Sequence, residues 1–123
     1  LLDGLRMKGA AAREPQVSFK ELYFLENSRQ IRAAVDMPLA YVGGSKSLAN
    51  AEQVVAEGFE CVVMARALIH DPDLVNKYRS GAAVQSGCDN CNACVAYIYH
   101  PDGTWCVKNP HNDPALNRIG AAD

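Results

Sequence analysis

Leu39-Ala40-Tyr41-Val42-Gly43-Gly44 has the pattern of a short buried strand that is followed at once by two glycines. A second apolar run, Cys61-Val62-Val63-Met64, predicts another buried strand and is followed by Ala65-Arg66. Between the runs, Ser47 is suited to cap a helix and Gly58 to end it. A strand, a helix and a strand with short connections predict a parallel crossover, and therefore an α/β sheet or barrel.

Further helices are predicted on both sides of this unit. The first covers residues 18–35, where Ser18 and Glu21 have the spacing of a capping box. The second covers residues 72–80 and is expected to stop at Gly81.

Both predicted strands end in residues that suit an anion. Gly43 and Gly44 would let backbone amides approach a phosphate without a side chain in the way. Ala65 and Arg66 follow the second strand at its carboxyl end, where ligands of parallel α/β proteins bind. We expect these residues to grip one phosphate, with Arg66 adding charge and Lys46 assisting from the rim. The alternative to a phosphate site is that Gly43-Gly44 forms only a tight turn and that Arg66 is a surface charge.

Four of the five cysteines lie close together in the sequence, at Cys88, Cys91, Cys94 and Cys106. The turn Pro101-Asp102-Gly103 predicts a hairpin that would fold Cys106 back toward the other three. Four converging thiolates suit an iron–sulfur cluster first; the alternatives are thiols without a metal and, third, a tetrahedral zinc site. Cys61 is predicted to be a buried small apolar residue, and His70 to have a surface or capping role.

The ordered motifs resemble one family. They are Pro38-Leu-Ala-Tyr-Val-Gly-Gly, Ala51-Glu52, Glu57-Gly58, Val62-Val63-Met64-Ala65-Arg66-Ala67-Leu68-Ile69 and Asp71-Pro72. This series is similar to the Old Yellow Enzyme and 2,4-dienoyl-CoA reductase family of NADH:flavin oxidoreductases, over roughly residues 20–108. In that family these segments are the seventh and eighth strands of a TIM (β/α)8 barrel, whose ends hold the FMN phosphate.

The resemblance implies the C-terminal part of such a barrel, with a Cys-rich hairpin extension. FMN would be the cofactor, and its phosphate would contact Gly43, Gly44, Ala65 and Arg66; Ala65 stands where a glycine is often found. The cysteine spacing is similar to that of the iron–sulfur members, dienoyl-CoA reductases and trimethylamine dehydrogenase, which hold a [4Fe–4S] cluster. The implied activity is reduction of activated C=C bonds with NAD(P)H.

On this interpretation the chain has three parts. Residues 1–17 form a loop or arm, residues 18–82 a partial barrel with the phosphate cradle, and residues 83–123 a Cys-rich metal-binding extension and tail. The net charge of -2 argues against nucleic acid or an anionic membrane surface as the main partner. No apolar run approaches the roughly 20 residues of a membrane span. Thiolates that must stay reduced fit the cytoplasm.

The length of the chain conflicts with independent catalysis. Its 123 residues fall short of the roughly 250 of a complete barrel. The family's substrate-binding and proton-donating residues belong to earlier strands. Because two strands leave bare sheet edges, we expect self-association or a complementary barrel portion on another polypeptide. The alternative function is a non-catalytic truncated barrel that self-associates, with its cysteines empty or zinc-bound.

Overall fold

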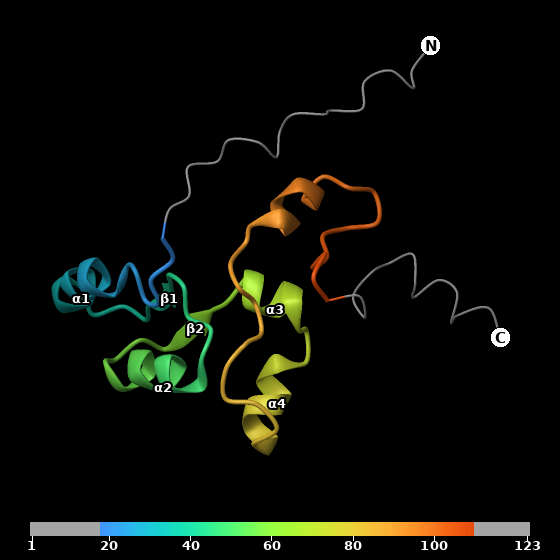
Figure 1. Cartoon of the computed structure of the whole chain (residues 1–123). Helices are drawn as coiled ribbons and strands as arrows, with labels where there is room; N and C mark the ends of the chain where they lie inside the picture. The colour runs from blue at the N-terminus through green and yellow to red at the C-terminus, as the bar shows by residue number, and fades with distance from the viewer. Residues whose placement is uncertain (1–17, 110–123) are drawn as a thin grey trace, which may run out of the picture.

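The computed structural model describes residues 18–109, so the predicted arm (1–17) and the end of the tail (110–123) lie outside the described residues (Figure 1). The elements are α1 (Leu25–Ala34), β1 (Ala40–Val42), α2 (Leu48–Ala56), β2 (Cys61–Val63), α3 (Arg66–His70), α4 (Leu74–Ser80) and the 3₁₀ helix η1 (Ala93–Tyr97). None of the helices in this part of the chain is long and apolar enough to cross a bilayer.

The predicted strand–helix–strand unit is confirmed as a two-stranded parallel sheet. β1 pairs with β2 so that Ala40 lies opposite Cys61 and Val42 opposite Val63. The intervening α2 begins where predicted, because the Ser47 hydroxyl accepts a hydrogen bond from a backbone amide of its first turn. The fold of the described residues is therefore α/β, while its origin in a barrel stays a prediction.

The first helix is shorter than predicted, and Glu21 does not cap it. α1 begins at Leu25, and no side chain caps its N-terminus. Glu21 lies instead at the start of α2, where its carboxylate accepts hydrogen bonds from the Ser47 hydroxyl at 3.3 Å and from the Asn50 side chain. A negative charge is favourable at a helix N-terminus. The Ser18–Glu21 capping box is therefore wrong, since Glu21 serves the second helix.

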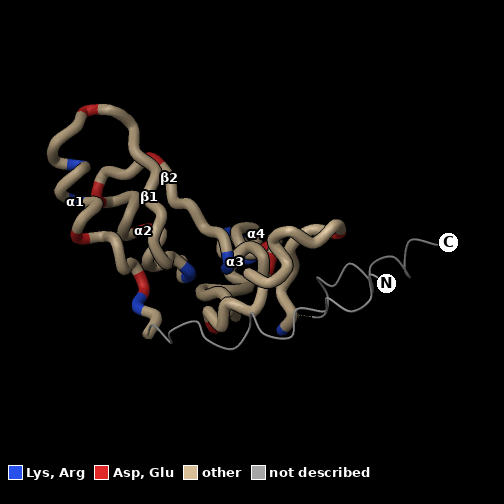
Figure 2. The backbone as a smooth tube through the Cα atoms, turned by 90° about the horizontal axis from the view of Figure 1, so that it is seen from above, with Lys and Arg blue, Asp and Glu red and all other residues tan. Residues whose placement is uncertain are grey.

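Two small hydrophobic cores hold the molecule together, one on each side of the chain between β2 and α3 (Figures 1 and 2). The core that packs α1 and α2 against the sheet consists of Leu25, Tyr41, Val54 and Phe59. The core of α3 and α4 consists of Ala67, Leu74 and Tyr78. The two halves are joined by the Tyr78 hydroxyl, which donates to the Lys46 carbonyl at 2.7 Å.

One face of the sheet is uncovered in this part of the chain. Tyr41 is buried, whereas its neighbour Val42 is 57% exposed and Val63 on β2 is 45% exposed. Cys61 is also exposed, so its predicted burial is wrong. Side chains of a strand alternate between its faces, and Cys61 shares the open face with Val63. The strands predicted to be buried are therefore covered on one face.

An apolar groove runs between α1 and β1. Its volume is about 380 Å³. Its apolar lining comes from Phe24, Ile31, Leu39, Ala40, Val42 and Phe59. The groove and the open sheet face leave large hydrophobic side chains in water.

The predicted hairpin of the C-terminal extension is wrong. No strand forms in residues 97–106, and the amide of His100 donates to the Tyr97 carbonyl at 3.0 Å, directly after η1. This local bond occupies a carbonyl that a strand ladder would need. The chain still turns back, because the Thr104 hydroxyl donates to the same carbonyl and the Tyr97 and Trp105 ring centroids lie 4.1 Å apart.

Gly44→Ala is expected to destabilise the fold more than Gly81→Ala. Both glycines have left-handed φ angles, +77° and +74°, so each alanine pays a backbone cost of roughly 1–2 kcal/mol. A Cβ at Gly44 would also meet the Tyr23 ring at 2.7 Å, while a Cβ at Gly81 would meet nothing within 4 Å. We expect about 1–3 kcal/mol of additional loss at Gly44. Urea unfolding measures both variants, and equal losses would contradict this packing.

Acid is expected to weaken the contact between α1 and the end of α2. Arg29 donates two 2.6 Å hydrogen bonds to the Glu57 carboxylate, which lower the Glu57 pKa from 4.5 to about 2. Because the folded state favours the charged form, this stabilisation is present above pH 4.5 and is lost as the pH falls toward 2. Glu57→Gln should therefore lose less stability than wild type between about pH 6 and about pH 3. Glu52→Gln is the control, because Glu52 is an exposed residue of α2, and this variant should lose as much stability as wild type over the same pH range.

Candidate functional site

The four predicted phosphate contacts lie at one edge of the sheet. Because Val42 and Val63 are opposite each other in parallel strands, the Gly43-Gly44 turn and the Ala65-Arg66 turn both follow the carboxyl ends of their strands. This edge is where parallel α/β proteins bind ligands. The structure thus brings together the residues that the sequence analysis grouped.

Two cations converge at this edge. The Lys46 ammonium lies 5.3 Å and the Arg66 guanidinium 5.8 Å from the centre of the Phe19 ring. Each also donates one hydrogen bond to the cysteine-bearing loop: Lys46 to the Cys88 carbonyl at 3.1 Å and Arg66 to the Asn92 side chain. Lysine has three donors and arginine five, so both retain donors for an anion.

Ser45 adds a feature that the sequence analysis missed. This residue follows the glycines and is 5% exposed, and its hydroxyl has no hydrogen-bond partner within the described residues. An unsatisfied buried hydroxyl costs about 1–3 kcal/mol. A phosphate oxygen would satisfy it, so the hydroxyl and the two nearby cations fit an anionic group. The only sequence signal for Ser45 is its position after Gly43-Gly44.

The glycines also have a packing role. Tyr23 and Phe19 lie against Gly44, where a Cβ would be 2.7 Å and 3.2 Å from their rings. The Tyr41 hydroxyl likewise approaches Gly43 and donates to its carbonyl at 2.9 Å. The alternative of a tight turn therefore accounts for part of the Gly-Gly sequence, whereas the Arg66 side chain is engaged with Asn92.

The cysteine-bearing segment is attached directly to the phosphate cradle, which consists of the Gly43-Gly44 and Ala65-Arg66 turns. Val84 and Ser86 run antiparallel beside the start of α2, where the Ser86 amide donates to the Lys46 carbonyl at 2.8 Å and the Leu48 amide donates to the Val84 carbonyl at 2.9 Å. Cys88 and Cys91, two of the candidate metal ligands, follow these residues directly in the sequence. These contacts hold the two candidate sites next to each other.

Local hydrogen bonds shape the loop that carries the cysteines. The amide of Cys88 donates to the Ser86 hydroxyl, and the amide of Cys91 donates to the Asp89 carboxylate, both at 3.2 Å. Asp89 also forms an ion pair with Lys108, which lowers the Asp89 pKa to about 2. Since Lys108 follows Cys106 in the sequence, this pair joins the two cysteine-bearing segments.

Three of the candidate ligands influence the fourth, Cys94. Burial raises the pKa of the Cys94 thiol, and the neighbouring Cys88, Cys106 and Cys91 raise it further. All four are free thiols. If all four were deprotonated, the thiolates would repel one another unless a positive charge lay among them, and a bound metal centre would supply that charge.

Four cysteine thiols are the donor set that iron–sulfur clusters use. Within residues 18–109, no three His, Cys, Asp or Glu side chains converge closely enough to hold one metal ion. A [4Fe–4S] cluster binds each cysteine through a different iron, so its four ligands stand further apart than those of zinc. The buried Asn90 amide nitrogen, which has no hydrogen-bond partner within the described residues, offers a donor to a sulfur acceptor.

His70 is the second residue whose role the sequence analysis did not find. Its ring nitrogen Nδ1 lies 3.3 Å from the Cys106 sulfur, which gives it a part-buried contact instead of the predicted surface or capping role. His70 ends α3, far from Cys106 in the sequence. No local pattern could have linked them.

Comparisons with known proteins identify two partial relatives. The chain is 45% identical over 93 residues to a "4,4'-dithiodibutanoate disulfide reductase" of Rhodococcus erythropolis, and 33% identical over 88 residues to a "bilirubin reductase" of Mediterraneibacter gnavus. The matches cover 76% and 69% of this chain but only 23% and 14% of the relatives. No family model and no solved structure matches. The chain is thus similar to one part of two oxidoreductases, and the family resemblance stays a prediction.

Proposed function

We propose that this chain is the C-terminal segment of an FMN-dependent NAD(P)H oxidoreductase that acts on activated C=C bonds. In this role it anchors the FMN phosphate and holds a [4Fe–4S] cluster. The observation that carries the proposal is the parallel register of β1 and β2, because it gathers Gly43-Gly44, Ala65 and Arg66 at one sheet edge. The names of the two relatives support the class of oxidoreductases.

The chain's own residues would bind the phosphate by complementary charge and hydrogen bonds. Backbone amides of the two turns approach the phosphate oxygens, Arg66 and Lys46 balance its charge, and the Ser45 hydroxyl gains the partner it lacks. When bound, FMN supplies hydride transfer. The protein's contribution here is to fix the end of the cofactor remote from the reacting ring.

The cysteine-bearing segment would hold the cluster beside this cradle. Cys88, Cys91, Cys94 and Cys106 are the ligands, and the Lys46 and Arg66 contacts to the loop keep the two sites adjacent. A short distance between the cluster and the flavin would allow electrons to pass between them. The remaining parts of the barrel would come from outside this chain, and they would cover the open sheet face and the groove beside α1.

The alternative function is a non-catalytic truncated barrel module that self-associates, with the cysteines empty or zinc-bound. The exposed apolar side chains of the groove and of the sheet favour it, because a second copy could cover them. FMN binding and turnover separate the two proposals.

The experiment compares the 123-residue chain with the longest native polypeptide that contains it. Each is purified anaerobically and assayed for NADH and NADPH oxidation with an enone, and with a disulfide as a second acceptor because one relative is named for such a substrate. We expect FMN in both preparations and enone-dependent turnover only in the longer polypeptide. A colourless self-associated chain, without turnover in either preparation, would support the alternative.

A further inference from the structure

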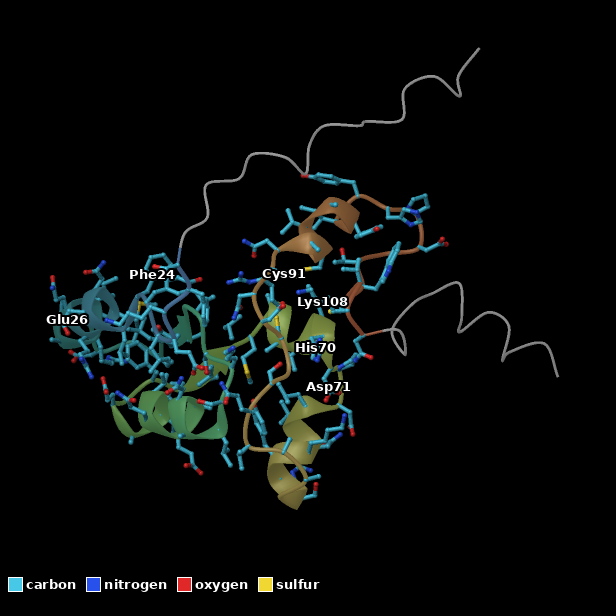
Figure 3. The ribbon with its side chains drawn as sticks, in the orientation of Figure 1. Phe24, Glu26, His70, Asp71, Cys91 and Lys108 are labelled. Carbon is cyan, nitrogen blue, oxygen red and sulfur yellow. The ribbon has the colours of Figure 1, made fainter. Side chains whose placement is uncertain are left out.

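His70 is held between the two segments that carry the cysteines. Its Nδ1 lies 3.3 Å from the Cys106 sulfur, and its backbone carbonyl accepts a hydrogen bond from the Asn109 side chain. Figure 3 shows His70 on α3. The contacts of this one residue therefore reach the segment around Cys106 through both its ring and its backbone.

Gly87 fixes the other side of the ring. A Cβ at position 87 would lie 2.6 Å from the His70 Nε2 atom, so only glycine leaves room for the imidazole there. Gly87 directly precedes Cys88. The ring is thus packed between the backbone next to Cys88 and the Cys106 side chain, which aims Nδ1 at the sulfur.

From this arrangement we infer that His70 is a positioning residue of the metal centre, whose Nδ1–H donates a hydrogen bond to the Cys106 thiolate. A thiolate has no proton to donate, so the imidazole must be the donor when Cys106 is a ligand. Cys106 is separated from the other three ligands by the longest stretch of sequence, and it gains most from being held in place. The inference rests on the proposed function for the presence of the cluster.

The hydrogen bond has an effect that a purely structural contact would lack. A donor to a ligand sulfur withdraws negative charge from it, and this stabilises the reduced state, which carries one more electron. Loss of the donor should therefore lower the reduction potential of the cluster. A residue that only fills space would leave the potential unchanged when replaced by an apolar side chain of similar size.

The test is the midpoint potential of the cluster in the full chain, measured by anaerobic redox titration followed by electron paramagnetic resonance. His70→Leu removes the donor, and we expect the ratio of reduced to oxidised cluster at a fixed potential to fall about tenfold, or about 59 mV for one electron. His70→Asn places an amide donor near the position of Nδ1 and should keep the potential close to that of wild type. His100→Phe is the control. It should keep the wild-type potential, because the His100 Nδ1 accepts its hydrogen bond from the amide of Asp102.

The outcomes separate this inference from the function on which it rests. A wild-type chain without iron and sulfide would overturn both. A cluster whose potential is the same in wild type and His70→Leu would overturn the inference alone. If His70→Leu fails to load iron, the loading of His70→Asn decides: retained iron supports the donor, and iron lost from both variants contradicts it.

Discussion

Cys94→Ser is expected to remove about nine-tenths or more of the iron from protein purified anaerobically. Burial raises the pKa of the Cys94 thiol, and Cys88, Cys106 and Cys91 raise it further, so Cys94 lies near the other three candidate ligands. A cluster that loses one of four thiolates loses both a bond and a fixed position for the rest. Bound iron and acid-labile sulfide per chain are measured in the two proteins.

The matched control for this prediction is Cys61→Ser. Cys61 lies exposed on the open face of the sheet, at the start of β2 rather than in the cysteine-bearing loop. Its replacement should leave the iron content unchanged. Equal iron in wild type and Cys94→Ser would exclude Cys94 as a ligand, and equal losses in both variants would indicate iron bound nonspecifically to thiols.

Arg66→Ala is expected to weaken FMN binding about 10-fold to 100-fold while changing riboflavin binding little. The loss corresponds to a charge-assisted hydrogen bond of about 1.5–3 kcal/mol. Riboflavin has the same ring system and no phosphate, so the ratio of the two affinities isolates the interaction with the anion. Fluorescence quenching of each flavin measures both dissociation constants in the same preparation.

Two variants control for indirect effects of Arg66→Ala. Asn92→Ala removes the acceptor of the Arg66 hydrogen bond but keeps the guanidinium, so it should retain most of the FMN preference. Arg79→Ala removes an exposed cation from α4 and should have no effect. If Arg66→Ala lowers the affinities for FMN and riboflavin equally, Arg66 does not bind the phosphate.

Local signals explain what the sequence predicted well. Ser47 capped α2 as expected, and Gly81 ended α4 in the left-handed conformation. The strands β1 and β2 also formed from their apolar runs, and a parallel crossover then brings their carboxyl ends to one edge without further information. These features depend on residues close together in the chain, where spacing and turn chemistry carry the information.

Long-range contacts explain most of what the sequence did not predict. Glu21 had a suitable partner at Ser18, but the start of α2 attracted its carboxylate. The contact between His70 and Cys106 depends on how α3 and the extension pack together. Cys61 is exposed on a face of the sheet that no other element covers within the described residues. For Glu21 and His70 the deciding neighbour is far away in the sequence.

Some local predictions failed because two local structures compete. The residues from Tyr97 to Trp105 have the aromatic and turn residues of a hairpin, yet the His100 amide bonds to the Tyr97 carbonyl directly after the 3₁₀ helix η1. α3, which follows Ala65, was not predicted because its five residues are too few to show helical periodicity.

The decisive measurement is the flavin, iron, sulfide and zinc content of freshly purified anaerobic protein, taken together with its visible absorption spectrum. We predict bound FMN with its absorption bands, a broad iron–sulfur absorbance, and about four iron and four sulfide per chain. A colourless protein that contains neither flavin nor iron, or one that holds zinc alone, would contradict the assignment of the cradle and the cysteines.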